Sequence, residues 1–150
     1  MILEGCWRSC VSDFYLNDGI LKAEAKRVNS QENILTKEAE ALCREIRSEF
    51  ETYAALNHRM PDEVIKSIED IQVPGIFADI VASHSTFDFK LKQGLLEEVN
   101  VIERLEKLLS ILLNENEILA LERNIHEKVH SEMDKGQRQY YLREQLKIIH

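Results

Sequence analysis

The chain has 150 residues, of which 44% are hydrophobic and 31% are charged, so it can bury one sizeable core as a single domain. Its net charge of −8 argues against nucleic acid as a partner of this chain, because a general nucleic-acid binder needs a basic surface. No window approaches 18 consecutive apolar residues, and the N-terminus has no apolar signal core, so neither a membrane span nor secretion is predicted.

Residues 1–28 predict a β-hairpin and differ in character from the rest of the chain. Asn17-Asp18-Gly19 is a strong turn signal, and residues 21–26 alternate between apolar and charged side chains, which is the period of a strand. Residues 10–16, before the turn, are also typical of a strand. Because two strands alone are marginally stable in water, we expect an exposed hairpin that docks on the helices or pairs with a neighbouring chain.

Residues 29–99 predict a helical bundle. After a polar linker at residues 29–33, apolar residues recur at three- and four-residue steps, which indicates one face of a helix. These residues are Leu35, Ala39, Leu42, Ile46, Phe50, Tyr53 and Leu56. Pro61 opens a second helix, Pro74 precedes a third, and residues 91–99 form a fourth. The short connections favour packing between sequential helices.

Residues 100–150 predict one very long helix. Asn100 is the expected N-cap, and Glu103 follows at the spacing of a capping box. At about 1.5 Å per residue the helix would be about 75 Å long, so it should reach beyond the domain. We expect it to pack on the bundle to about residue 133 and then to extend as a linker, with Gly136 as a candidate bend.

Most motifs in the sequence that would indicate a catalytic or metal site lack the surrounding residues that such a site needs. His126, Glu127 and His130 match the H-E-x-x-H pattern of zinc proteases, in which two histidines one turn apart bind the metal. Lys128 stands inside the motif and no third ligand is evident, so we interpret the pair as solvated histidines, with a metal-dependent hydrolase as the weakest alternative. Neither a phosphate-binding glycine loop nor a G-x-S-x-G nucleophile motif occurs, and three cysteines suit free thiols in the cytoplasm. We therefore predict no catalytic, cofactor-binding or metal-binding residue.

The end of the long helix is the candidate contact surface for a partner or substrate. Tyrosine and arginine, which are common anchors of interfaces, gather there far from the predicted bundle. The candidate contact residues are Met133, Tyr140, Tyr141, Leu142, Arg143 and Leu146. The alternative is that the tyrosines pack within contacts of their own helix.

Three segments carry a resemblance to a known family. Residues 137–147 read QRQYYLREQLK, residues 73–84 read VPGIFADIVASH, and residues 103–106 read ERLE. In this order and spacing they resemble the ATP-dependent protease Lon, in which the first segment lies between the substrate-binding N-terminal region and the ATPase domain. The likeness covers most of the chain from about residue 35 onward and, more weakly, the first 28 residues.

The resemblance implies a non-catalytic N-terminal fragment of an ATP-dependent serine protease, cut before the ATPase domain that would hold ATP and magnesium. Residues 1–28 would then be the remnant of a larger β domain. The family resemblance implies recognition of unfolded or damaged proteins and support of a hexamer. The alternative is a purely structural coiled-coil spacer without affinity for substrate. The sequence does not separate the two, because the apolar residues along the long helix suit self-association as well as the binding of unfolded proteins.

Overall fold

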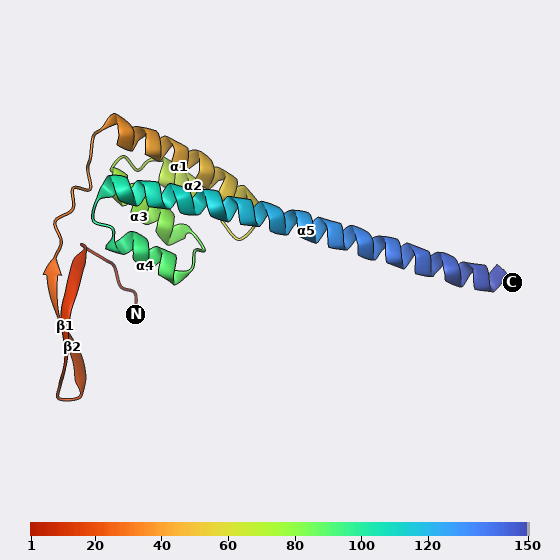
Figure 1. The fold of residues 1–150 in the computed structure, drawn as a ribbon, viewed down its shortest axis with the longest axis horizontal. Coiled ribbons are helices and arrows are strands. Elements are labelled where there is room, and N and C mark those ends of the chain that lie inside the picture. The colour runs from red at the N-terminus through yellow and green to blue at the C-terminus, as the bar shows by residue number, and fades with distance from the viewer. Residues whose placement is uncertain (150) are drawn as a thin grey trace.

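The computed structural model describes residues 1–149 and has two strands followed by five helices. The elements are β1 (Ser9–Asn17), β2 (Ile20–Arg27), α1 (Lys37–Leu56), α2 (Asp62–Glu69), α3 (Pro74–His84), α4 (Phe89–Glu97) and α5 (Val101–Ile149). Helices α1 to α4 gather around the first part of α5, the hairpin projects from one end, and α5 continues far beyond the other (Figure 1). The predicted mainly α fold with a long C-terminal helix and an N-terminal hairpin is confirmed.

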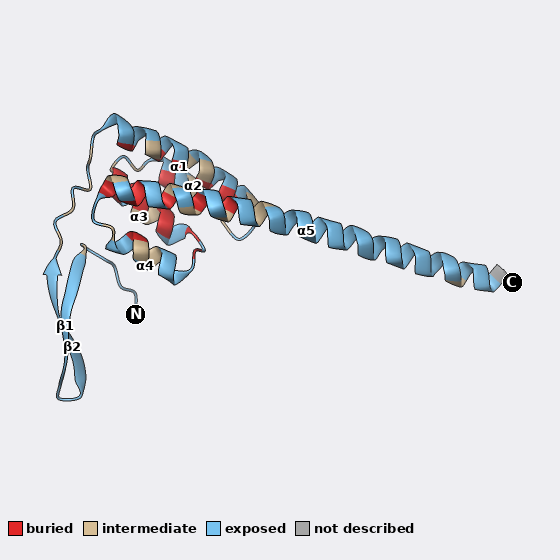
Figure 2. Cartoon of the chain, viewed as in Figure 1, coloured by how far each residue is buried: buried red, intermediate tan, exposed pale blue. Residues whose placement is uncertain are grey.

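The hairpin has the tight turn that the sequence predicts. Asp18 and Gly19 have φ angles of 52° and 76°, which are the two left-handed residues of a type I′ turn. The strands pair antiparallel from Asn17 and Ile20 to Ser9 and Arg27, with a bulge between Val11 and Phe14. Every residue of both strands is exposed, in agreement with the expected exposed hairpin (Figure 2).

Helix α1 begins two residues later than its periodic pattern indicates. Thr36 is the N-cap, and its hydroxyl accepts a hydrogen bond of 3.1 Å from the backbone N–H of Ala39. Leu35 therefore lies outside the helix and is 86% exposed, although its spacing suggested a buried position. From Ala39 onward the predicted face is buried and packs against α3 and the first part of α5.

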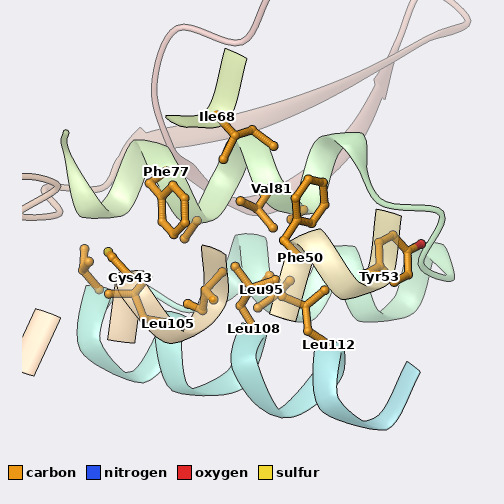
Figure 3. Packing of buried hydrophobic residues seen from close by; sticks show 14 of the residues in the cluster. Cys43, Phe50, Tyr53, Ile68, Phe77, Val81, Leu95, Leu105, Leu108 and Leu112 are labelled. Carbon is orange, nitrogen blue, oxygen red and sulfur yellow. The ribbon is translucent and has the colours of Figure 1, made fainter. Parts of the chain in front are cut away.

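The core contains side chains from all five helices. It is built on fully buried leucines of α5 that face Phe50 of α1 and Phe77 and Val81 of α3 (Figure 3). Tyr53 closes one end, where its ring stacks on Phe50 at 5.9 Å between centroids. The leucines are Leu105, Leu108 and Leu112. Such contacts explain why the short helices α2 and α4 are held, since neither is long enough to be stable alone.

Helix α5 starts where the sequence predicts, with a modified cap. Asn100 Oδ1 accepts a hydrogen bond of 3.2 Å from the N–H of Glu103, which confirms the N-cap. The reciprocal bond comes from Glu98, whose carboxylate accepts the N–H of Asn100 at 3.2 Å. The helix then continues without interruption to Ile149, through Gly136.

Packing on α5 ends earlier than the sequence suggests. Asn116 is its last buried residue, and Leu119 is the last apolar side chain packed against the core. Residue 133, near which we expected packing to end, lies well beyond this point. The four-residue apolar pattern continues to Met133, but no other element of residues 1–149 reaches that far along the helix (Figure 2). At about 1.5 Å per residue, the part of α5 from Leu121 onward is about 43 Å long.

Candidate functional site

The outer half of α5 carries a row of uncovered apolar side chains, which we call the distal surface. Each of its apolar members is at least 49% exposed. Its members are Leu121, Ile125, Val129, Met133, Tyr140, Tyr141, Leu142, Arg143 and Leu146. All six residues predicted to contact a partner therefore lie on one exposed helix segment.

The contacts of the distal surface are local. The Tyr141 hydroxyl accepts a hydrogen bond of 2.7 Å from Gln145, one turn further along the helix. Beside the distal surface, Lys147 pairs with Glu144 at 3.2 Å and Arg123 pairs with Glu127 at 3.3 Å, both within α5. Exposed pairs of this kind add little stability, so the distal surface is free to make contacts with another molecule.

The histidine pair of the H-E-x-x-H pattern lies on this exposed segment. The rings of His126 and His130 stack with centroids 6.4 Å apart, and His130 Nε2 lies 3.7 Å from the carboxylate of Asp134. Within residues 1–149, no group of three histidine, cysteine or acidic side chains is placed to hold a metal ion. A catalytic zinc site needs three protein ligands in a closed cleft, and this pair has two on an open helix.

Four charged side chains, which we call the hub, join the start of the hairpin to the helices. Arg8 precedes β1, Glu32 lies between β2 and α1, Asp79 is in α3 and Arg104 is in α5. Arg8 donates two hydrogen bonds of 2.7 Å to the two carboxylate oxygens of Asp79. Arg104 donates to Glu32 at 2.9 Å and lies 3.5 Å from Asp79. Two arginines thus share two carboxylates at the base of the hairpin.

Backbone groups complete the hub. Arg8 Nε donates to the carbonyl of Leu96 at 2.8 Å, near the end of α4. The carbonyl of Glu32 accepts the N–H of Gly75 at 2.9 Å. A Cβ at position 75 would lie 2.9 Å from the Cα of Glu32 and would overlap its carboxylate, so this approach requires glycine.

The hub changes the ionisation of Glu32. Burial alone would raise the pKa of this carboxyl group, but hydrogen bonds from Ser30 and Arg104 and the positive charges of Arg104 and Arg8 outweigh it. The pKa of Glu32 is therefore below its ordinary value of 4.5. The carboxylate stays charged at neutral pH and holds both arginines.

Sequence reasoning missed the hub as a structural unit, although one signal was present. Val101, Leu105 and Leu108 define the buried face of α5, and Arg104 lies on that same face. A charged residue at a core position must find a counter-charge, because an unpaired buried charge is costly. The sequence does not indicate that the partners are Glu32 and Asp79, which are remote along the chain.

A comparison with protein families finds a match over most of the chain. Residues 1–114 match the family described as the ATP-dependent protease La (LON) substrate-binding domain. That span contains the hairpin, α1 to α4 and most of the packed part of α5. No helix within residues 1–149 is long and apolar enough to cross a membrane.

Several curated relatives align with nearly the whole chain. A Lon protease of Brevibacillus choshinensis is 40% identical over 152 residues, which cover 99% of this chain and 19% of that protein. A Lon protease of Azospirillum brasilense is 40% identical over 99% of this chain and 18% of its own length. A Lon protease of Clostridium acetobutylicum is 36% identical over 99% of this chain and 19% of its own length. The chain thus spans about a fifth of these relatives, and it belongs to the Lon protease family, to the part that contains the substrate-binding domain.

Proposed function

We propose that this chain is a non-catalytic, cytoplasmic region of a Lon-like protease that binds unfolded or damaged proteins through the distal surface. The observation that carries the proposal is the row of uncovered apolar side chains along the outer half of α5. Unfolded chains expose apolar side chains that folded proteins bury, and covering a valine or leucine side chain contributes about 1.5–3 kcal/mol. An apolar row without a fixed pocket therefore suits clients of varied sequence.

The same surface also supports a proposal of self-association, leading to a hexamer in the full-length protein. Tyrosine and arginine in the distal surface are residue types that anchor protein interfaces. In this proposal, ATP hydrolysis and peptide cleavage are carried out elsewhere in the full-length protein, and this chain takes part in neither. Its acidic charge of −8 disfavours nucleic acid as a partner.

The test measures binding of a fluorescently labelled, permanently unfolded protein, with its folded form as the control. We compare the native chain with Val129→Glu, which places a carboxylate in the distal surface. Ser131→Glu is the matched variant, because it adds the same charge about 200° round the helix. We expect preferential binding of the unfolded form, weakened about tenfold by Val129→Glu and unchanged by Ser131→Glu.

The alternative function, a structural spacer, is supported by the uninterrupted course of α5 through Gly136. Light scattering on the same samples separates the two functions. If the unfolded protein does not bind and the chain forms a defined dimer or larger assembly, the function is that of a structural spacer and not recognition of unfolded proteins. Equal binding of folded and unfolded protein would also overturn the proposal, because it would indicate nonspecific adhesion.

A further inference from the structure

A groove opens on the bundle at the start of α1, far from the distal surface. It has a volume of about 430 Å³ and lies between the first turns of α1 and the connection from α2 to α3. This volume is within the range of about 300–1,000 Å³ that is typical of ligand pockets. We call it the α1 groove.

The floor of the α1 groove is apolar. Cys43 and Phe77 lie together at one end of the core (Figure 3). Both residues line the groove, as does Pro74. Ile34 and Ile71 are half-buried and form the walls. Such a floor accommodates an aliphatic or aromatic side chain, because it offers apolar contacts without a buried polar group that needs a partner.

The rim of the α1 groove is basic, although the chain as a whole is acidic. The rim contains three basic side chains, those of Lys37, Arg44 and Arg47. It contains one carboxylate, that of Glu40. Arg44 pairs with Glu40 at 2.6 Å, whereas Lys37 forms no ion pair within residues 1–149. The guanidinium of Arg47 lies 4.4 Å above the Phe77 ring and donates to the carbonyl of Ile71 at 2.6 Å, so it is held at the groove.

We infer that the α1 groove binds a peptide segment in which an apolar side chain stands beside an acidic residue. The apolar side chain packs between Ile34 and Ile71 and covers Cys43, and the carboxylate pairs with Lys37 and the rim arginines. Charge complementarity selects this occupant, since a basic rim on a protein of net charge −8 attracts an anionic segment that the rest of the surface repels. This site goes beyond the proposed function, because it is separate from the distal surface and has a stated sequence preference.

Cys43 provides a direct reporter of occupancy. It is 7% exposed, and burial raises the pKa of its thiol despite the nearby Arg47 charge, so its alkylation is slow and sensitive to cover. Cys6 and Cys10 are exposed and are replaced by serine, which leaves Cys43 as the single thiol. The probe is a short peptide with phenylalanine between two aspartates. Control peptides carry lysines in place of the aspartates, or serine in place of the phenylalanine.

At ten times its Kd, the acidic peptide should slow alkylation of Cys43 about tenfold, because only the unoccupied protein reacts. Neither control peptide should protect at the same concentration. Lys37→Glu with Arg44→Glu should abolish the protection. The matched double variant Arg123→Glu with Lys128→Glu should retain it, since it makes the same change in charge and also breaks an exposed ion pair.

The melting temperature of each variant is recorded. If Lys37→Glu with Arg44→Glu melts at a lower temperature than the native chain, Leu35→Asp takes its place, because Leu35 lies at the rim and outside any helix. Equal protection by the acidic and lysine peptides would overturn the inference, as would unchanged protection in Lys37→Glu with Arg44→Glu. Absence of protection at millimolar peptide would overturn it as well. Val129→Glu should weaken binding of the unfolded protein without changing the protection of Cys43 by the acidic peptide. The two proposals can therefore fail separately.

Discussion

Replacing Glu32 by alanine tests whether the hub holds the helices in place. The substitution leaves the guanidinium of Arg104, whose side chain is 0% exposed, with Asp79 at 3.5 Å as its remaining counter-ion. The lost hydrogen bond between charged groups is worth about 1.5–3 kcal/mol. The longer contact with Arg8, at 3.4 Å, adds at most about 1 kcal/mol. We expect a loss of about 3 kcal/mol in unfolding free energy, at the lower end of the roughly 3–5 kcal/mol for breaking a buried pair.

The assay is urea unfolding followed by far-ultraviolet circular dichroism, with the difference taken from the midpoints at a shared m-value. Glu40→Ala is the matched control, because it removes an ion pair with Arg44 that is short, at 2.6 Å, but exposed. That control should change the unfolding free energy by no more than about 0.5 kcal/mol. If Glu32→Ala costs no more than Glu40→Ala, the hub does not stabilise the fold and the reasoning is wrong.

The pH dependence of the same difference follows from the lowered pKa of Glu32. A carboxyl group whose pKa is lower in the folded state stabilises the fold at pH values above its unfolded pKa, which is 4.5 for Glu32. This contribution is lost as the pH falls through the folded value. The difference between the native chain and Glu32→Ala should therefore be largest near neutral pH and shrink below about pH 4. A difference that stays constant down to pH 2 would exclude an ionic origin.

Three further predictions concern α5. Leu112→Ala should cost about 2–5 kcal/mol in urea unfolding because Leu112 is fully buried, whereas Leu113→Ala, at a half-exposed neighbour, should cost less than about 1 kcal/mol. Gly136→Ala should slow amide exchange in the outer half of α5 by stabilising that helix by about 1 kcal/mol, without moving the main melting transition. Tyr141→Ala should leave the melting temperature almost unchanged and weaken self-association in light scattering; a large drop in melting temperature would indicate local packing instead.

Local patterns in the sequence were enough to predict most of the elements. The Asp18-Gly19 turn and the Asn100 cap were predictable because each depends on residues within a few positions along the chain. The buried face of α5 was predictable from its spacing through Leu105, Leu108 and Leu112. The structure also places all six candidate contact residues on the exposed outer half of α5; their binding role remains a prediction.

Features that depend on distant parts of the chain were not predictable in the same way. Spacing shows that Ile125 and Val129 share a helix face, but it does not show whether the bundle reaches that face. Arg104 pairs with a carboxylate 72 residues away, and no local rule identifies that partner. The α1 groove likewise combines residues of α1 with residues of the α2–α3 connection, so it exists only once those segments have packed.

The early end of packing on α5 has a consequence for how its outer half forms. Starting a helix in water is unfavourable by a factor of about 1,000, or about 4 kcal/mol, whereas each added residue is close to neutral. The first turns of α5 are already fixed by the core, so the bundle acts as the nucleus from which the outer half grows. Helical order in the outer half therefore depends on the packed first turns of α5, and we expect it to rise when a bound molecule covers part of that half. The outer half of α5 is thus the part of the helix whose order depends most on the contacts that cover it.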